Sequence, residues 1–437
     1  MKLQFKLASI ALPLALLLGL AACSDNKKGD EMSSNSAKSE VATTPSAPSK
    51  EESEAKAGEE VQEDKAKEST DMPKEAVKES TDAASTESME STSETTKGDS
   101  QASMQDMAEK PNIVILATGG TIAGAVDSSI KTTDYAAGVV GVEALMNAVP
   151  EIKNLASIQG EQIANIDSAD MTTSIWLSLA KRVNELLSDP KINGVVITHG
   201  TDTMEETAYF LHLVIDSAKP VVLVGAMRPS TAISADGPKN LYNAVAVAAD
   251  PSAAGRGVMV ALNDRIQSAR FVSKTHALNV QAFSSPNSGD MGYVVDGQVF
   301  WNYAPSRLHT TDSEFDVSNL ESLPRVEILY SYAEDGSAMA AEALYNQGIK
   351  GLVIAGTGAG SIHKNHKEAL KSLLQKGLVV VQSSRVNAGI VMAGEEDSKL
   401  GFVGAMDLNP QKARVLLMLA LTKTGVPADI AKFFEKY

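Results

Sequence analysis

The chain from residue 111 to residue 437 repeats one pattern, in which a short apolar run is followed by a turn and then by a segment with helical spacing. The apolar runs are continuous rather than alternating, which is typical of strands buried on both faces of a sheet. These runs are NIVILATGG, INGVVITHG, PVVLVGAM, GVMVALND, RVEILYSY, GLVIAGTGAG and GLVVVQSS. The helical segments include GVEALMNAVP, TSIWLSLAKRVNELL and MEETAYFLHLVI. The pattern predicts an α/β fold.

A break in this pattern predicts two domains of unequal size. Residues 310–324, TTDSEFDVSNLESLP, have neither period and end in proline, so we expect a domain boundary there. We place a larger N-terminal sheet domain at 111–310, a linker at 311–324 and a smaller domain with a parallel, flavodoxin-like sheet at 325–437. This length is sufficient for two sizeable cores.

The first 22 residues have the pattern of a secretory signal peptide. Lys2 and Lys6 precede the apolar run LASIALPLALLLGLAA, which is shorter than the ~20 residues of a membrane-spanning helix. The run ends in LAAC, which resembles the lipobox of bacterial lipoproteins and implies cleavage before Cys23 and attachment of a diacylglycerol to its thiol. The alternative is ordinary cleavage after a small residue, with Cys23 incidental. Ser24, in place of aspartate, favours the outer membrane.

Residues 23–110 predict a disordered acidic tether. They consist mainly of Ser, Thr, Glu, Lys, Ala and Asp, and ESTD occurs twice. Such a composition cannot bury enough apolar area to offset the entropy of ordering. The tether holds 22 acidic residues and 11 lysines, and the part after it keeps a net charge of −7. We expect no nucleic-acid partner, because neutralising phosphates requires a basic face.

Cofactor chemistry has little support in the sequence. Cys23 is the only cysteine, so no thiolate in the folded part can serve catalysis or a metal. The turn GGTIAG lacks the Lys-Ser/Thr of a P-loop, GTGAGS lacks the dinucleotide fingerprint, and the six histidines form neither HExxH nor a GxSxG-linked triad. We expect neither a cofactor nor a metal. Of the histidines, only His199 is expected to position a neighbour.

Two glycine-rich turns follow predicted strands, where ligands of α/β sheets bind. In ATGGTIAG, the glycine pair allows a sharp turn and leaves Thr121 accessible at the strand tip. In THGTDTMEETAYFL, Asp202 and Thr203 can cap a helix whose first turn carries Glu205 and Glu206, as in a capping box. That structural interpretation leaves Thr201 unexplained. A threonine, a carboxylate and backbone N–H groups at a helix N-terminus also form a pocket for a polar substrate.

ILATGGTIAG and GVVITHGTDTMEETAYFL resemble both signature segments of the bacterial type II (exported) L-asparaginase family. The resemblance continues through PVVLVGAMRPSTAISADGPKNLYNA, SSRV, LGFV and LNPQKARVLLMLALT, and covers essentially all of 111–437. It implies a hydrolase that converts L-asparagine into L-aspartate and ammonia. Thr121 matches the family nucleophile, which forms the acyl-enzyme. Tyr135 matches a loop tyrosine that closes over the site and hydrogen-bonds that hydroxyl.

The resemblance also assigns the remaining site residues. Thr201, Asp202 and Lys274 match a second cluster, Ser168 matches a residue that holds the substrate α-carboxylate, and Asp202 would hold the α-ammonium group. A threonine hydroxyl needs a neighbour to take its proton, and a lysine whose pKa is lowered by burial can help through a second hydroxyl. Backbone N–H groups near Thr201 and Ala226 are candidate oxyanion donors, and Gly200 is a further candidate for substrate binding. Without the resemblance, Lys274 would be interpreted as a solvated lysine, Tyr135 as a surface tyrosine and Ser168 as a helix cap.

Three positions depart from the family pattern. Ala169 stands where many members have Gln or Glu, and Ala359 replaces a common asparagine that reaches a neighbouring subunit's site. Either Glu395 or Glu396 aligns with the partner subunit's glutamate. Loss of polar partners affects discrimination, and we expect asparagine to be preferred over glutamine. The resemblance implies a homotetramer built of two tight dimers.

Three other functions compete with this one. The first is a mixed glutaminase-asparaginase acting on L-glutamine as well. The second is a lipid-anchored amino-acid-binding protein, which would bind its ligand without turnover and leaves the Thr121, Thr201 and Lys274 combination unexplained. An amidotransferase subunit acting on transfer RNA is disfavoured by export and by the acidic tether. The expected location is the periplasm, with the protein anchored to a membrane through Cys23.

Overall fold

The computed structural model describes residues 109–131 and 136–437. The signal peptide, Cys23, nearly all of the tether and Tyr135 therefore lie outside the described residues. Within the described ranges, none of the helices combines the length and apolar character that crossing a membrane requires.

The N-terminal part is built on an eight-stranded mixed sheet in the order β10-β9-β6-β5-β4-β3-β1-β2. Five neighbouring strands run parallel: β1 Asn112–Gly119, β2 Ser157–Ile166, β3 Gly194–Thr198, β4 Val221–Val224 and β5 Val258–Leu262. Three antiparallel strands extend it: β6 Arg265–Ser268, β9 Gly292–Val295 and β10 Gln298–Trp301. A separate two-stranded sheet pairs β7 Ser273–Lys274 with β8 Phe283–Ser284.

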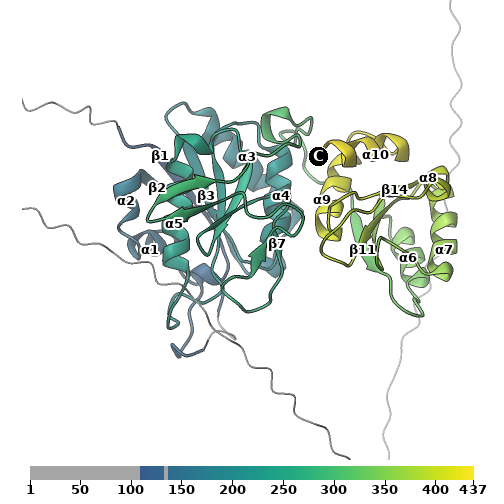
Figure 1. Ribbon diagram of the computed structural model, residues 1–437, viewed down its shortest axis with the longest axis horizontal. Helices are drawn as coiled ribbons and strands as arrows, with labels where there is room; N and C mark the ends of the chain where they lie inside the picture. Colours follow the sequence, from purple (N-terminus) through teal and green to yellow (C-terminus); the bar gives the residue numbers. More distant parts are fainter. Residues whose placement is uncertain (1–108, 132–135) are drawn as a thin grey trace, which may run out of the picture. The chain divides into compact units, whose positions relative to one another are not determined.

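Helices cover both faces of the large sheet (Figure 1). Along β1, Ile113 and Ile115 pack into one core, and Val114 and Leu116 pack into the other. This arrangement explains why the apolar run is continuous, since successive side chains of a strand point to opposite faces. The helices are α1 Val142–Asn147, α2 Ile152–Leu155 and α5 Gly237–Ala249 on the first core, and α3 Thr173–Ser188 and α4 Met204–Val214 on the second.

The C-terminal part holds a four-stranded, all-parallel sheet in the order β11-β12-β13-β14. Its strands are β11 Val326–Tyr330, β12 Gly351–Gly356, β13 Val379–Ser384 and β14 Phe402–Gly404. Its helices are α6 Ala338–Asn346, α7 Lys364–Gln375, α8 Glu395–Leu400, α9 Pro410–Ala420 and α10 Pro427–Lys436. The expected α/β class, with a larger N-terminal sheet and a smaller parallel one, is confirmed.

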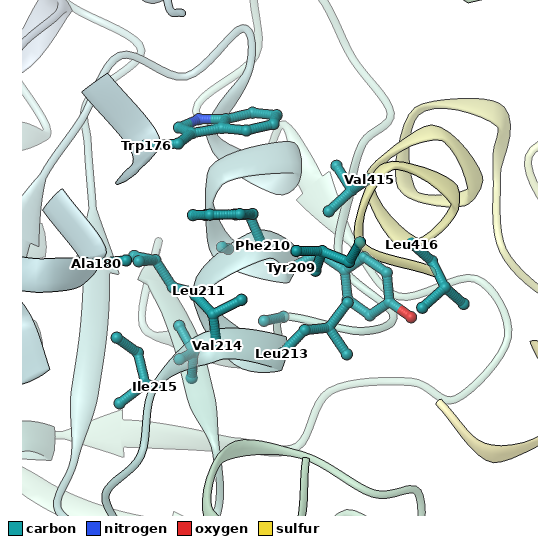
Figure 2. Packing of buried hydrophobic residues seen from close by; sticks show 14 of the residues in the cluster. Trp176, Ala180, Tyr209, Phe210, Leu211, Leu213, Val214, Ile215, Val415 and Leu416 are labelled. Carbon is teal, nitrogen blue, oxygen red and sulfur yellow. The ribbon is translucent and has the colours of Figure 1, made fainter. Parts of the chain in front are cut away.

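One core continues from α4 into α9. Tyr209 and Phe210 of α4 are fully buried in the same cluster as Val415 and Leu416 of α9, and Trp176 stacks on Phe210 (Figure 2). Four short 3-10 helices complete the described elements, and two of them carry candidate residues: η1 Thr121–Ala123, η2 Ser168–Asp170, η3 Pro251–Ala253 and η4 Thr310–Asp312.

Candidate active site

The two glycine-rich turns leave the sheet side by side. β1 and β3 are neighbouring parallel strands, and Ala117 pairs with Thr198 near their carboxyl ends. The Thr118 hydroxyl donates a hydrogen bond to the Thr198 carbonyl oxygen at 2.9 Å. This bond holds β1 and β3 together just before the two turns begin. Thr121 begins η1 directly afterwards, and only 4% of it is exposed. The register therefore brings Thr121 and Thr201 to one end of the sheet.

Glycine at 120 and 200 makes this close approach possible. Gly120 has a φ of 80°, and a Cβ there would lie 2.3 Å from the Cα of Gly200. A Cβ on Gly200 would lie 2.5 Å from the Ser168 Oγ. Since no side chain fits at either position, the Thr121 turn, the Thr201 turn and Ser168 form one packed unit.

Thr201, Asp202 and Lys274 form a hydrogen-bonded cluster. The Lys274 Nζ donates to the Thr201 Oγ1 at 2.9 Å and makes a short ion pair with an Asp202 carboxylate oxygen. Thr201 is buried, whereas the Asp202 side chain is 61% exposed and the Lys274 side chain 15%. The lysine thus lies between a buried hydroxyl and an accessible carboxylate, an arrangement that can move a proton and hold a cationic group of a ligand.

Ser168 is tied to the start of α4. Its Oγ accepts from the Asp202 N–H at 3.2 Å, and its carbonyl oxygen accepts from the Thr203 hydroxyl at 2.7 Å. The expected capping box is absent from the described N-terminus of α4, because Thr203 makes no side-chain cap. Its hydroxyl is directed to Ser168, and the Glu205 carboxylate is also directed elsewhere.

Glu205 is a site residue that the sequence analysis missed. The residue is 5% exposed, and its carboxylate accepts from the Lys274 N–H at 2.9 Å and from the Asn409 side-chain amide at 3.0 Å. A signal was present in the sequence, since Glu205 has helical spacing with Ala208 and Tyr209 and therefore shares their apolar face. A carboxylate on such a face requires buried partners.

His199 orients the backbone beside the site. Its Nδ1 lies 2.7 Å from the Gly200 carbonyl oxygen and its Nε2 lies 2.9 Å from the Thr207 Oγ1, which accepts from the Trp176 indole at 2.8 Å. A carbonyl can only accept, so Nδ1 carries the proton and Nε2 accepts from Thr207. Complete burial lowers the pKa of His199 to about 4 and keeps the ring neutral. The expected positioning role fits this geometry.

Ala226 lies fully buried just after β4. Its neighbour Gly225 packs against the same turn, because a Cβ there would lie 3.2 Å from the Thr201 Cγ2. The next two N–H groups, of Met227 and Arg228, donate to the Asp236 carboxylate. Those two donors are engaged in holding the loop.

The structure does not bring every expected residue into the cluster. Ala169 and Ala359 are exposed, as are Glu395 and Glu396, and Glu395 pairs with Lys399 of the same helix. Over 109–131 and 136–437 no three His, Cys, Asp or Glu side chains lie close enough together to hold a metal ion.

Comparisons with family models and with known proteins assign the chain to a family. Residues 112–307 match the family model "Asparaginase, N-terminal" and residues 325–434 match "Glutaminase/Asparaginase C-terminal domain". L-asparaginase 2 of Bacillus subtilis is 51% identical over 342 residues, which cover 78% of this chain and 91% of the relative. Glutaminase-asparaginase of Pseudomonas fluorescens is 48% identical over 329 residues, covering 75% and 90%. The crystal structure of the probable cytoplasmic L-asparaginase of Campylobacter jejuni aligns with a TM-score of 0.74 and 64% identity over 75% of this chain and 100% of that one. The chain belongs to the asparaginase family.

Proposed function

We propose that the protein is an L-asparagine amidohydrolase that releases L-aspartate and ammonia. The observation that carries this proposal is the close contact of Gly120 with Gly200, which brings the turn that carries Thr121 against the turn that carries Thr201, the hydrogen-bond partner of Lys274. Relatives named L-asparaginase support the same reaction.

In the proposed mechanism, the Thr121 hydroxyl attacks the side-chain amide carbonyl of asparagine. An O–C bond forms, the C–N bond breaks, and the hydroxyl proton passes to the leaving nitrogen, which departs as ammonia. Water then attacks the ester, releases aspartate and restores Thr121. The Thr201 hydroxyl, joined to Lys274, is proposed to carry the proton between these groups.

The polar groups around this nucleophile match the two charged groups of an amino acid. We assign the α-carboxylate to Ser168 and to the backbone of the Gly200 turn, beside the N-terminus of α4. The α-ammonium group is assigned to Asp202, whose carboxylate is accessible. The N–H groups of Thr201 and Ala226 are proposed oxyanion donors. Tyr135 is proposed to close over Thr121.

Asparagine is the proposed preferred substrate, and a mixed glutaminase-asparaginase is the second candidate because a glutaminase-asparaginase is among the relatives. Both candidates are tested by measuring ammonia release from asparagine and from glutamine, with the full-length wild type and with the Thr121→Ala variant. Release from asparagine that is lost in Thr121→Ala supports the proposal. Comparable kcat/KM for glutamine would favour the mixed enzyme, and binding of asparagine without ammonia release would favour a binding protein.

We further propose that lipidated Cys23 anchors the enzyme in the periplasm, at the outer membrane, and that it acts as a homotetramer. The support for the anchor is the LAAC sequence and the acidic stretch 23–110. The support for the tetramer is membership of the asparaginase family, with domains proposed at 111–310 and 325–437 and a linker at 311–324. Either Glu395 or Glu396 would reach a neighbouring subunit's site. Detergent partitioning of the wild type against Cys23→Ser tests the anchor, and light scattering on the solubilised protein tests the assembly.

A further inference from the structure

The segment that leads to Lys274 is held by the first turn of α9, about 140 residues later in the chain. The buried Lys412 amine donates to the carbonyl oxygens of Arg270, at 3.0 Å, and of Val272, in a short bond. The Ser273 hydroxyl accepts from the Asn409 amide at 2.9 Å and donates to the Asn387 side chain at 3.1 Å. Residues of the C-terminal part therefore fix the backbone up to the position before Lys274.

Asn409 connects these hydrogen bonds to Glu205. Its Nδ2 donates both to the Ser273 Oγ and to the Glu205 Oε1, while its Oδ1 accepts from the Lys412 N–H at 3.0 Å as the N-cap of α9. The second oxygen of Glu205 accepts from the Lys274 N–H. An amide side chain can act as donor and acceptor at once, which neither a carboxylate nor an aliphatic side chain can do.

The strand that carries Lys274 has little support of its own. β7 has two residues and, among the strands of the described ranges, pairs only with the two-residue β8. The Lys274 side chain must nevertheless place its Nζ 2.9 Å from the Thr201 Oγ1. Displacement of a reacting group by about 1 Å is sufficient for a large loss of rate.

We propose that Asn409 is a positioning residue that fixes Lys274 against Thr201 by joining Glu205 and Ser273 to the cap of α9. This inference rests on the proposed asparagine hydrolysis. Asn409 touches no reacting atom in this scheme and acts only through the Glu205 carboxylate and the Ser273 hydroxyl of β7.

The test exchanges the hydrogen-bond donor and acceptor between Asn409 and Glu205. Asn409→Asp keeps a good N-cap but removes the donor and sets two carboxylates against each other. Glu205→Gln alone sets two amide groups together. In the double variant, the amide introduced at position 205 can donate to the carboxylate introduced at position 409, while the amide oxygen still accepts from the Lys274 N–H.

We expect each single variant to lower kcat about tenfold or more with KM within about threefold, and the double variant to recover at least about fivefold over either single. Asn365→Asp, an exposed amide-to-acid change in the first turn of α7, is the matched control and should keep wild-type kinetics. A double variant no faster than the single variants would overturn the proposal.

A second measurement does not depend on turnover. Acylation of Lys274 is followed by peptide mass spectrometry relative to the exposed Lys399 of the same molecule. We expect the ratio to rise several-fold in Asn409→Asp and to return towards wild type in the double variant.

Wild-type protein that releases no ammonia would refute the proposed reaction and leave this ratio interpretable. If Asn409→Asp does not fold, Asn409→Ser, which still caps but cannot reach Glu205, serves in its place. An unchanged ratio together with kcat within twofold would overturn the inference.

Discussion

Gly120 lies against Gly200 so closely that a Cβ on Gly120 would fall 2.3 Å from both the Cα and the N of Gly200. Gly120→Ala must therefore separate the two turns, in addition to the strain of a side chain at positive φ. We expect at least a hundredfold fall in kcat/KM and a lower Tm. Gly255→Ala is the control, since Gly255 has a φ of 73° and a Cβ added there would meet no other atom within 4 Å. Equal loss of activity in both variants would show that backbone strain alone is responsible.

The contribution of the Thr201 hydroxyl to activity can be measured separately from that of the side-chain volume. Thr201→Val removes the acceptor of the Lys274 Nζ but keeps the volume, and we expect kcat to fall by about 10² or more, the scale of general acid–base catalysis. Thr201→Ser keeps the hydroxyl and should retain most of the activity. Steady-state ammonia release, with a thermal melt of each variant, checks the prediction. Near-normal kcat in Thr201→Val would remove Thr201 from the proton path.

Acid should destabilise the protein through His199. The pKa of His199 falls from 6.5 in the unfolded chain to about 4 in the buried site. Between these values the unfolded chain binds a proton that the native protein excludes, so stability is present above pH 6.5 and is lost as the pH falls towards 4. At pH 5 the loss is about 2 kcal/mol. Urea unfolding at pH 7.5 and 5 should show a smaller difference for His199→Asn than for the wild type, whereas the exposed His276→Gln should resemble the wild type.

Alkaline pH should act in the other direction through Lys412. Burial lowers its pKa from 10.5 to about 8. Above pH 8 the unfolded chain still binds a proton that the native amine has released, so stability rises with pH until the unfolded pKa is reached. The neutral amine retains two donors for its two carbonyl partners. From pH 8 to 10 we expect the unfolding free energy of the wild type to rise by about 2 kcal/mol relative to Lys412→Met. Parallel curves for the two proteins would contradict the lowered pKa.

In the N-terminal sheet, the strands that the hydrophobic pattern predicted are those covered on both faces. β1, β3, β4 and β5 are almost wholly buried and therefore have continuous apolar sequences. β2 lies at the sheet edge with the sequence SIQGEQIANI, half of it exposed, and was not predicted. The antiparallel β6, β9 and β10 have four residues each, too few for a period to stand out.

Some residues of the candidate site could also be predicted from the sequence, and others could not. Thr121, Thr201 and Asp202 lie within local motifs, so a short stretch of sequence was sufficient to single them out. Glu205 was assigned to a capping box, and that prediction was wrong because its partners are Lys274 and Asn409. Asn409 lies 204 positions further along the chain, and no local pattern contains such a pair.

The direction of β1 has a practical consequence for any attachment of this protein. The strand begins at Asn112 and ends at Gly119, one residue before the turn that presents Thr121. Its eight residues separate these two ends by about 23 Å. Whatever is joined ahead of Asn112 is therefore fastened at the end of β1 opposite the turn. Immobilisation through the N-terminus should leave the amide substrate free to diffuse in, whereas coupling through the loops after β3 or β4 should obstruct it.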